Sequence, residues 1–128
     1  MTTFEITEAT FPETVKQPGV VLIDWWAPWC APCRMFAPIY EKVAARHPDV
    51  RFGKIDTESQ PLLAAAFQIR SIPTLMVVKD GKVIFAEPGM MQDRPLEGLV
   101  KWATELDLSK VGAGEMPARP RPGTALGR

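Results

Sequence analysis

The stretch Val20-Val21-Leu22-Ile23-Asp24-Trp25-Trp26-Ala27-Pro28-Trp29-Cys30-Ala31-Pro32-Cys33 decides how this chain folds, because it joins a buried strand to a helix through a pair of cysteines. The continuous apolar run over residues 20–23 is typical of a strand buried on both faces of a parallel sheet. From about Pro32 to Arg46, apolar side chains recur every three or four residues, which predicts a helix that Pro38 should bend. The two cysteines therefore fall at the junction between a strand and a helix N-terminus.

This junction suits thiol chemistry. A helix N-terminus carries unsatisfied N–H groups and a partial positive charge, so the pKa of Cys30 should fall below the free value of roughly 8.5. We expect Cys30 to be partly exposed and to attack a substrate disulfide as the nucleophile. Cys33 lies one turn further on and should be more buried; it would then attack Cys30 and release the reduced substrate. Pro32 stiffens the start of the helix.

The rest of residues 1–108 alternates strand and helix signals in the order β-α-β-α-β-α-β-β-α. Crossover helices imply parallel strands, and a final hairpin adds an antiparallel edge, so the chain is predicted to be an α/β protein with a mixed sheet between helices. The remaining predicted elements are a helix starting with the capping-box spacing Thr10-Phe11-Pro12-Glu13 and ending at Gly19, a strand Val50–Asp56, a helix opened by Ser59 and Pro61 and running through Phe67, strands Thr74–Val78 and Val83–Phe85 joined by Lys79-Asp80-Gly81-Lys82, and a helix from about Arg94 to Leu106.

Composition limits the possible functions. The 128 residues fit one domain, and a formal net charge of zero gives no global field for nucleic acid or an anionic membrane. No run of roughly 18 apolar residues is present, and the start resembles no signal peptide, so we expect a cytoplasmic monomer. Two cysteines and the single histidine, His47, offer at most three metal ligands in one chain, so no metal centre is expected. Redox chemistry remains.

Residues 109–128 differ from the rest, with four Gly, three Pro, three Arg and almost no large apolar side chains. Such a segment cannot bury enough surface to offset its ordering entropy, so we predict a disordered tail after a domain of residues 1–108. The tail carries an excess of positive charge. It is either simply solvated or makes a weak contact with an acidic partner.

Several motifs together resemble the thioredoxin family. Residues 23–34 are similar to its active-site segment, which usually reads Trp-Cys-Gly-Pro-Cys. Residues 69–75 are similar to its cis-proline segment, residues 79–83 to its hairpin, and Gly89 to its loop glycine. The likeness covers about residues 4–108. It implies the thioredoxin fold, a five-stranded mixed β-sheet flanked by four α-helices.

The resemblance also implies roles for two charged residues. Asp24 corresponds to the family's buried aspartate below the dithiol, where burial would raise its pKa and let it accept the Cys33 proton as a general base. Lys54 corresponds to the lysine beside this aspartate. From the residues alone, Asp24 could instead face solvent at a strand end, and Lys54 could be an ordinary surface lysine.

The resemblance further implies a docking surface around Cys30. Pro73 should be preceded by a cis bond, which lets the backbone of Ile72 bind an extended substrate strand. The residues expected at this surface are Trp29, Ala31, Pro32, Ile72, Pro73, Gly89 and Met90. Packing is the alternative role for Trp29 and Met90, and we assign Trp25, Trp26 and Trp102 mainly to the core.

The expected function is that of a thioredoxin-like protein-disulfide reductase. It would bind no cofactor, take electrons indirectly from NADPH through a thioredoxin reductase, and pass them to disulfide-containing target proteins. The alternatives are a non-catalytic binding or assembly module that uses the same apolar surface, and an oxidase or isomerase of an oxidising compartment. Ala31 in place of the usual glycine leaves the redox potential open, and Pro88 before Gly89 is unusual for the family. We expect His47 to lie at a helix end, where the dipole favours it, and not to act as a base.

Overall fold

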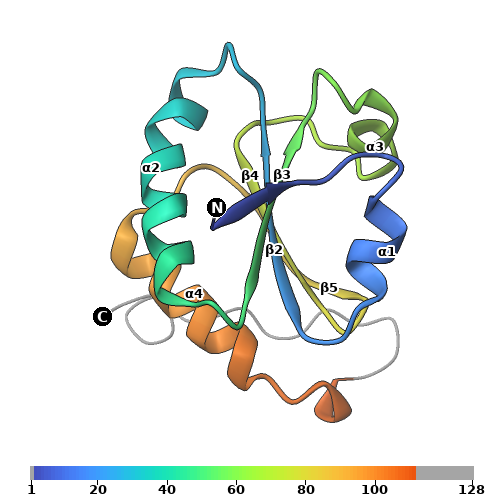
Figure 1. Ribbon diagram of the computed structural model, residues 1–128, viewed down its shortest axis with the longest axis vertical. Coiled ribbons are helices and arrows are strands. Elements are labelled where there is room, and N and C mark those ends of the chain that lie inside the picture. The colour runs from blue at the N-terminus through green and yellow to red at the C-terminus, as the bar shows by residue number, and fades with distance from the viewer. Residues whose placement is uncertain (1, 112–128) are drawn as a thin grey trace.

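The computed structural model describes residues 2–111, in which five strands form a single sheet in the order β1-β3-β2-β4-β5 (Figure 1). The first strand, to which the sequence assigned no residues, is short. The elements are β1 (Thr3–Glu5), α1 (Phe11–Lys16), β2 (Val20–Trp26), α2 (Ala31–Arg46), β3 (Arg51–Asp56), α3 (Pro61–Ala66), β4 (Thr74–Lys79), β5 (Lys82–Pro88), α4 (Asp93–Glu105) and the 3₁₀ turn η1 (Leu108–Lys110).

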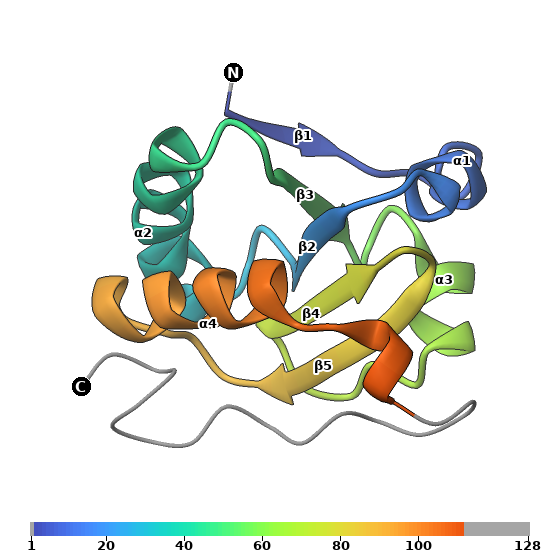
Figure 2. The same cartoon turned by 90° about the horizontal axis from the view of Figure 1, so that it is seen from below.

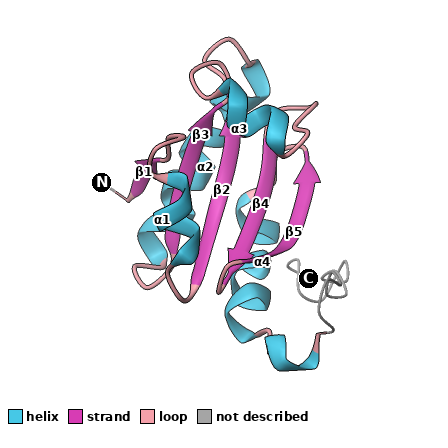
Figure 3. Ribbon diagram, turned by 90° about the vertical axis from the view of Figure 1, so that its right-hand side faces the viewer, coloured by secondary structure: helices cyan, strands magenta, loops and turns pink. Residues whose placement is uncertain are grey.

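The sheet is mixed, as predicted. Strands β1, β3 and β2 run parallel, β4 pairs antiparallel with β2, and β5 closes the hairpin with β4 (Figure 3). The predicted hairpin turn is confirmed, because Asp80 and Gly81 both have positive φ, at 49° and 82°. Positive φ at both central residues defines the turn type that the Asp-Gly pair favours.

Helices α2 and α4 cover one face of the sheet, and α1 and α3 cover the other (Figure 2). Successive side chains along β2 point to opposite faces of the sheet, so this strand contributes to the core on both sides. Leu22 packs in the cluster shared with α2 and α4, while Ile23 and Trp25 pack in the cluster shared with α1 and α3. All three are fully buried, so both faces of β2 are covered, as the unbroken apolar run of residues 20–23 at its start predicted.

Close contact between β1 and β3 depends on Gly53. A Cβ atom at this position would lie 2.4 Å from Cδ1 of Ile6, a fully buried residue. The backbone carbonyl of Gly53 also accepts a 2.8 Å hydrogen bond from the Tyr40 hydroxyl of α2. Gly53 thus brings β1, β3 and α2 together next to Lys54.

The predicted start of α1 is confirmed, since Thr10 is its N-cap, but the side-chain bond of the capping box is absent. Instead Thr7 and Thr10 each accept a hydrogen bond from the other's backbone N–H, just before the helix begins. The predicted cap of α3 is wrong. Ser59 does not cap α3, because Gln60 occupies that position and the Ser59 hydroxyl binds Asp56. The hydroxyl finds a stronger acceptor in the carboxylate at the end of β3.

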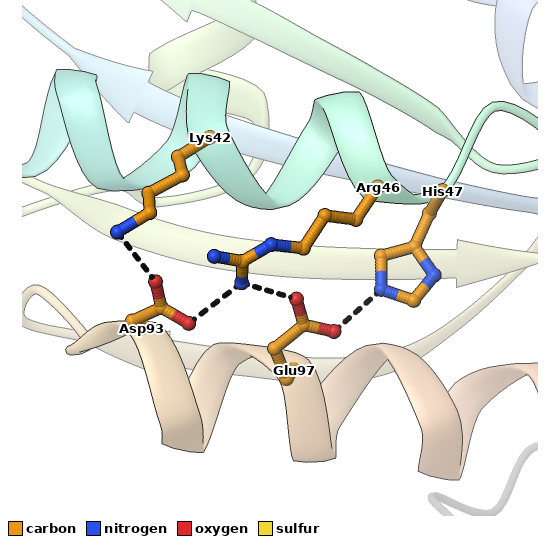
Figure 4. A network of polar contacts seen from close by, with 5 residues as sticks. All are labelled: Lys42, Arg46, His47, Asp93 and Glu97. Atoms are coloured by element: carbon orange, nitrogen blue, oxygen red, sulfur yellow. Dashed lines mark hydrogen bonds and ion pairs between the residues drawn. The ribbon is translucent and has the colours of Figure 1, made fainter.

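A polar network joins α2 to α4 (Figure 4). Arg46 donates to Asp93 at 2.8 Å and to Glu97 at 2.7 Å, Lys42 lies 3.4 Å from Asp93, and His47 Nε2 lies 2.6 Å from Glu97. His47 therefore sits at the end of α2, as predicted, and binds the neighbouring helix.

The C-terminal boundary is only partly covered by the structure. The predicted tail begins at residue 109, and the turn η1 reaches Lys110. Residues 112–128, most of the predicted tail, lie outside the described residues. Within residues 2–111, no helix has the length and apolar character needed to cross a membrane.

Candidate active site

The two cysteines lie at the junction between the end of β2 and the first turn of α2. Cys30 is the N-cap of α2, and its Sγ accepts a 3.2 Å hydrogen bond from the backbone N–H of Cys33. The two residues form a disulfide, with their Cα atoms 5.2 Å apart. The Cys30 sulfur thus lies at the helix N-terminus, next to a backbone N–H that has no partner within the helix. This position favours the thiolate of Cys30 once the disulfide is reduced.

The expectation that Cys30 is partly exposed is not met in this oxidised form. Cys30 is only 4% exposed, close to the 2% of Cys33. The cause is local, since the half-buried Trp26 and Ile72 pack against the cysteine pair. The difference in exposure has the predicted sign, but it is small.

Two loops meet beside the disulfide. The Ile72–Pro73 bond is cis, as the resemblance implied, and the Ile72 carbonyl oxygen lies 3.7 Å from Cys30 Sγ. Gly89, at φ 103°, donates its N–H to the Pro73 carbonyl at 2.8 Å. This bond joins the loop after β5 to the cis-proline loop before β4, which borders Cys30 through Ile72.

The side chains predicted to form the docking surface differ in exposure. Trp29 is 65% exposed, which excludes core packing for it, and Ala31, Pro32 and Gly89 are also exposed. Ile72 is half-buried and Pro73 is buried. Met90 is half-buried and packs against the α2/α4 cluster, so its alternative role in packing is present in the structure. Its part in docking stays a prediction.

Asp24 is fully buried in the middle of the sheet. Neither of its carboxyl oxygens has a hydrogen-bond partner among the described residues. Burial raises the pKa of Asp24 from an ordinary value of 3.8 to about 7, against the opposing influence of the Lys54 charge. The solvent-facing alternative for Asp24 is therefore wrong, and the group can gain or lose a proton near neutral pH.

Lys54 lies beside Asp24, because the two residues are directly paired in the β2–β3 register. It is half-buried, and its Nζ sits 4.6 Å from the centre of the Trp26 ring. Lys54 is therefore partly covered and adjacent to Asp24, and its functional role stays a prediction. Trp26 proves to be half-buried like Trp102, whereas Trp25 is in the core as predicted. The ring of Trp26 serves as a support for the lysine ammonium.

Comparison with known proteins decides the family. The family model described as Thioredoxin matches residues 2–105. The chain belongs to the Thioredoxin family. It is 49% identical over 109 residues to putative thioredoxin 2 of Streptomyces coelicolor, a match that covers 85% of this chain and 81% of the relative. It is also 47% identical over 79 residues to thioredoxin 1 of Synechococcus elongatus, covering 60% of this chain and 74% of that protein.

The fold agrees with solved thioredoxins. The structure of a mutant thioredoxin from Halobacterium salinarum superposes with a TM-score of 0.74 and 30% identity, over 82% of this chain and 92% of that one. Thioredoxin-family membership and a Cys30–Cys33 pair at disulfide distance identify the chain as a thiol–disulfide oxidoreductase that acts as a disulfide reductase. Family members act on disulfide targets and are themselves reduced by a reductase.

Two neighbouring residues of α2, Tyr40 and Glu41, were not predicted to belong to the site. Tyr40 is fully buried on α2, and burial, followed by the negative charges of Asp24 and Glu41, raises its pKa well above the ordinary value. Glu41 accepts hydrogen bonds from the Thr2 and Thr3 hydroxyls at the start of the chain. The helical spacing placed Tyr40 on an inner face, but it gave no sign that β1 would lie against Glu41.

The site is built for thiol exchange. Residues 2–111 contain no group of three or more His, Cys, Asp or Glu side chains arranged to hold a metal ion. The site instead contains the Cys30–Cys33 pair at a helix N-terminus and the Ile72 carbonyl beside the Cys30 sulfur. It also contains the buried Asp24 carboxyl, whose pKa is about 7.

Proposed function

We propose that this chain is a cytoplasmic thioredoxin that reduces disulfides of target proteins with electrons from NADPH, delivered by a thioredoxin reductase. The observation that carries the proposal is the position of Cys30 as the N-cap of α2, bonded to Cys33 and next to the cis Ile72–Pro73 bond. No bound cofactor takes part. The protein acts as a monomer and uses neither nucleic acid nor a membrane.

The reaction is two successive exchanges. The Cys30 thiolate attacks one sulfur of the target disulfide, which forms a mixed disulfide and releases the other target sulfur as a thiolate that takes up a proton. The Cys33 thiolate then attacks the Cys30 sulfur. This step forms the Cys30–Cys33 disulfide and releases the second target sulfur, so two electrons pass from the dithiol to the target.

Asp24 serves the second step as proton acceptor for Cys33, directly or through a water molecule. A carboxyl with a pKa of about 7 is present in both protonation states at neutral pH, so it can accept the proton and later return it. Lys54 limits how far burial raises this pKa. The buried location of Cys33 makes such an internal acceptor necessary, because bulk water has little access to that thiol.

The target binds across the docking surface. The exposed Trp29 ring offers apolar contact area, while the Ile72 backbone at the cis bond pairs with an extended target segment. The bond from Gly89 to Pro73 keeps both edges of this surface in place. Ala31, Pro32 and Met90 complete the surface.

The test is reduction of a disulfide-bonded protein, coupled to NADPH oxidation through a thioredoxin reductase. Wild-type protein is expected to turn over, Cys30→Ser to be inactive, and Cys33→Ser to accumulate the mixed disulfide. The matched control is Ser59→Ala, which changes an exposed hydroxyl near α3. Failure of the wild-type protein to turn over would refute the proposal.

The same variants separate catalysis from a role as a binding module. A module that only uses the apolar surface would keep its partner when Cys30 is replaced by serine. A reductase loses all effect on the target's disulfide state with this substitution, while the Trp29 surface is unchanged.

A further inference from the structure

We propose that Glu41 is a positioning residue of this reductase: it shares the Lys54 ammonium with Asp24 and so sets how readily Asp24 exchanges a proton. The inference rests on the proposed role of Asp24 as proton acceptor. Glu41 itself touches neither sulfur in any contact that the structure shows. It acts through Lys54.

The strand register places three charged residues in a row. Lys54 on β3 is paired with Asp24 on β2 and with Glu5 on β1. In parallel strands, directly paired residues point to the same face, and Leu22 and Phe52 show that this face packs under α2. The Lys54 side chain therefore lies between a buried carboxyl on one side and the sheet edge on the other.

Glu41 approaches the same lysine from α2. A small cavity of about 210 Å³ at the β1 edge is lined by Thr3, Phe4, Glu5, Glu41 and Lys54. Lys54 therefore reaches a space that also contains two carboxylates, while the Trp26 ring lies under its ammonium. The lysine charge is divided between this cavity and Asp24.

Glu41 is held in place and ionised. The Thr2 and Thr3 hydroxyls donate to its two different carboxyl oxygens. Although burial alone would raise the pKa of Glu41, these hydrogen bonds and the Lys54 charge outweigh burial and lower it. A fixed negative charge therefore faces Lys54 throughout the neutral pH range.

The groups that face Lys54 come from every element packed around it. They are Asp24 from β2, Glu5 from β1 and Glu41 from α2. Tyr40, which precedes Glu41 on α2, donates its hydroxyl to the Gly53 carbonyl. Glu5 is exposed, and no hydrogen bond from residues 2–111 holds its carboxylate, whereas two hold that of Glu41. Glu41 is thus the carboxylate whose charge stays directed at Lys54.

Replacing Glu41 by glutamine should leave the full Lys54 charge available to Asp24. We expect the pKa of Asp24 in Glu41→Gln to fall by about half a unit, the scale of a partly screened ion pair. The pH at which Cys33 attack reaches half its maximal rate should fall with it. Glu41→Asp, which retains the charge, should restore most of the wild-type value.

The decisive measurement is a double-mutant cycle on the carboxyl titration of Asp24, followed by NMR in the oxidised full-length protein. If Glu41 acts through Lys54, the shift caused by Glu41→Gln is present with Lys54 and absent in the Lys54→Met background. Glu13→Gln removes an exposed carboxylate on α1, across the sheet, and should leave Asp24 unchanged. An equal shift in both backgrounds, or no shift in either, would overturn the inference.

This titration is independent of catalysis. If Asp24→Asn reduces disulfides as fast as wild type, the proposed proton acceptor fails even when the titration cycle behaves as expected. If Asp24→Asn is slow but Glu41→Gln does not move the Asp24 titration, the proposed function stands and the positioning role of Glu41 fails.

Discussion

Replacing Asp24 by asparagine should stabilise the oxidised protein at high pH. Asp24 is fully buried without a hydrogen-bond partner among the described residues, and burial raises its pKa from 3.8 to about 7. The folded protein therefore keeps the Asp24 proton up to about pH 7, while the unfolded chain loses it near pH 3.8. Between these values the unfolded state binds fewer protons, so wild-type stability falls as the pH rises.

The size of the effect follows from the width of this interval. One pKa unit corresponds to about 1.4 kcal/mol, so the gap of roughly three units amounts to about 4 kcal/mol above pH 7. An asparagine amide at the same place is also buried without partners, which costs about 1–3 kcal/mol. Because this cost does not depend on pH, it changes the stability difference between variant and wild type by a constant amount. It does not change how that difference varies with pH.

The assay is urea denaturation of wild type and Asp24→Asn between pH 5 and 9, with the disulfide intact in both. The free energy of unfolding of the variant, relative to wild type, should rise by about 1.4 kcal/mol per pH unit up to about pH 7 and then level off. The comparison cancels every other titrating group. A difference that is constant over the whole range, or that falls with pH, would refute the reasoning.

Four further substitutions test the surrounding structure. Gly53→Ala should cost about 1–3 kcal/mol in urea denaturation, since its Cβ would lie 2.4 Å from Cδ1 of Ile6; an unchanged midpoint would show that β1 can move away. Lys79→Met should cost about 2 kcal/mol, because the Lys79 ammonium donates to three carbonyls at the end of α4; retained stability would mean that water replaces it. Arg46→Gln should lower the thermal midpoint at low salt but much less in concentrated NaCl, and a salt-independent loss would contradict an electrostatic origin. Trp29→Ala should change stability by less than about 0.5 kcal/mol yet lower kcat/KM for protein disulfides, and full activity would remove Trp29 from the docking surface.

The sequence was most informative where a local pattern is compatible with only one kind of structure. The apolar run of residues 20–23 could be buried only as a central strand, and Asp80-Gly81 fits the turn of a tight hairpin, so β2 and the β4–β5 pair were predicted correctly. Boundaries were less well defined. The run stops at Ile23, but β2 continues to Trp26, because sheet pairing on both sides extends the strand through a charged residue.

Contacts between distant segments could not be read from local patterns. Even locally, one pattern can compete with another: the spacing of Thr10 and Glu13 met the capping-box rule, yet Thr7, three residues away, supplied a competing partner for Thr10. For Glu41 no role was predicted from the sequence. Its hydrogen bonds come from residues almost forty positions earlier, and only the placement of β1 beside β3 brings them together.

The cis bond and the proton acceptor depended on resemblance for the same reason. Proline alone favours a trans bond, and an aspartate at a strand end ordinarily faces water. Both preferences are reversed at Pro73 and Asp24. Such reversals of local preference are expected at functional sites, where the rest of the fold compensates for them.

The lack of hydrogen bonds to Asp24 from the described residues is itself informative about function. A buried carboxylate is usually stabilised by hydrogen-bond donors. Tyr40 on α2 carries a buried hydroxyl close enough for the Asp24 charge to raise its pKa. That hydroxyl instead donates to the Gly53 carbonyl. A donor to Asp24 would hold the pKa of its carboxyl low and remove its capacity to take a proton near neutral pH. The Tyr40 hydroxyl is therefore bonded to backbone, and the Asp24 carboxyl is influenced by the Lys54 charge instead. This charge limits the rise in the pKa of Asp24 without holding its proton in place. Stability is lower as a result, and under the proposed mechanism this carboxyl is the base that accepts the Cys33 proton.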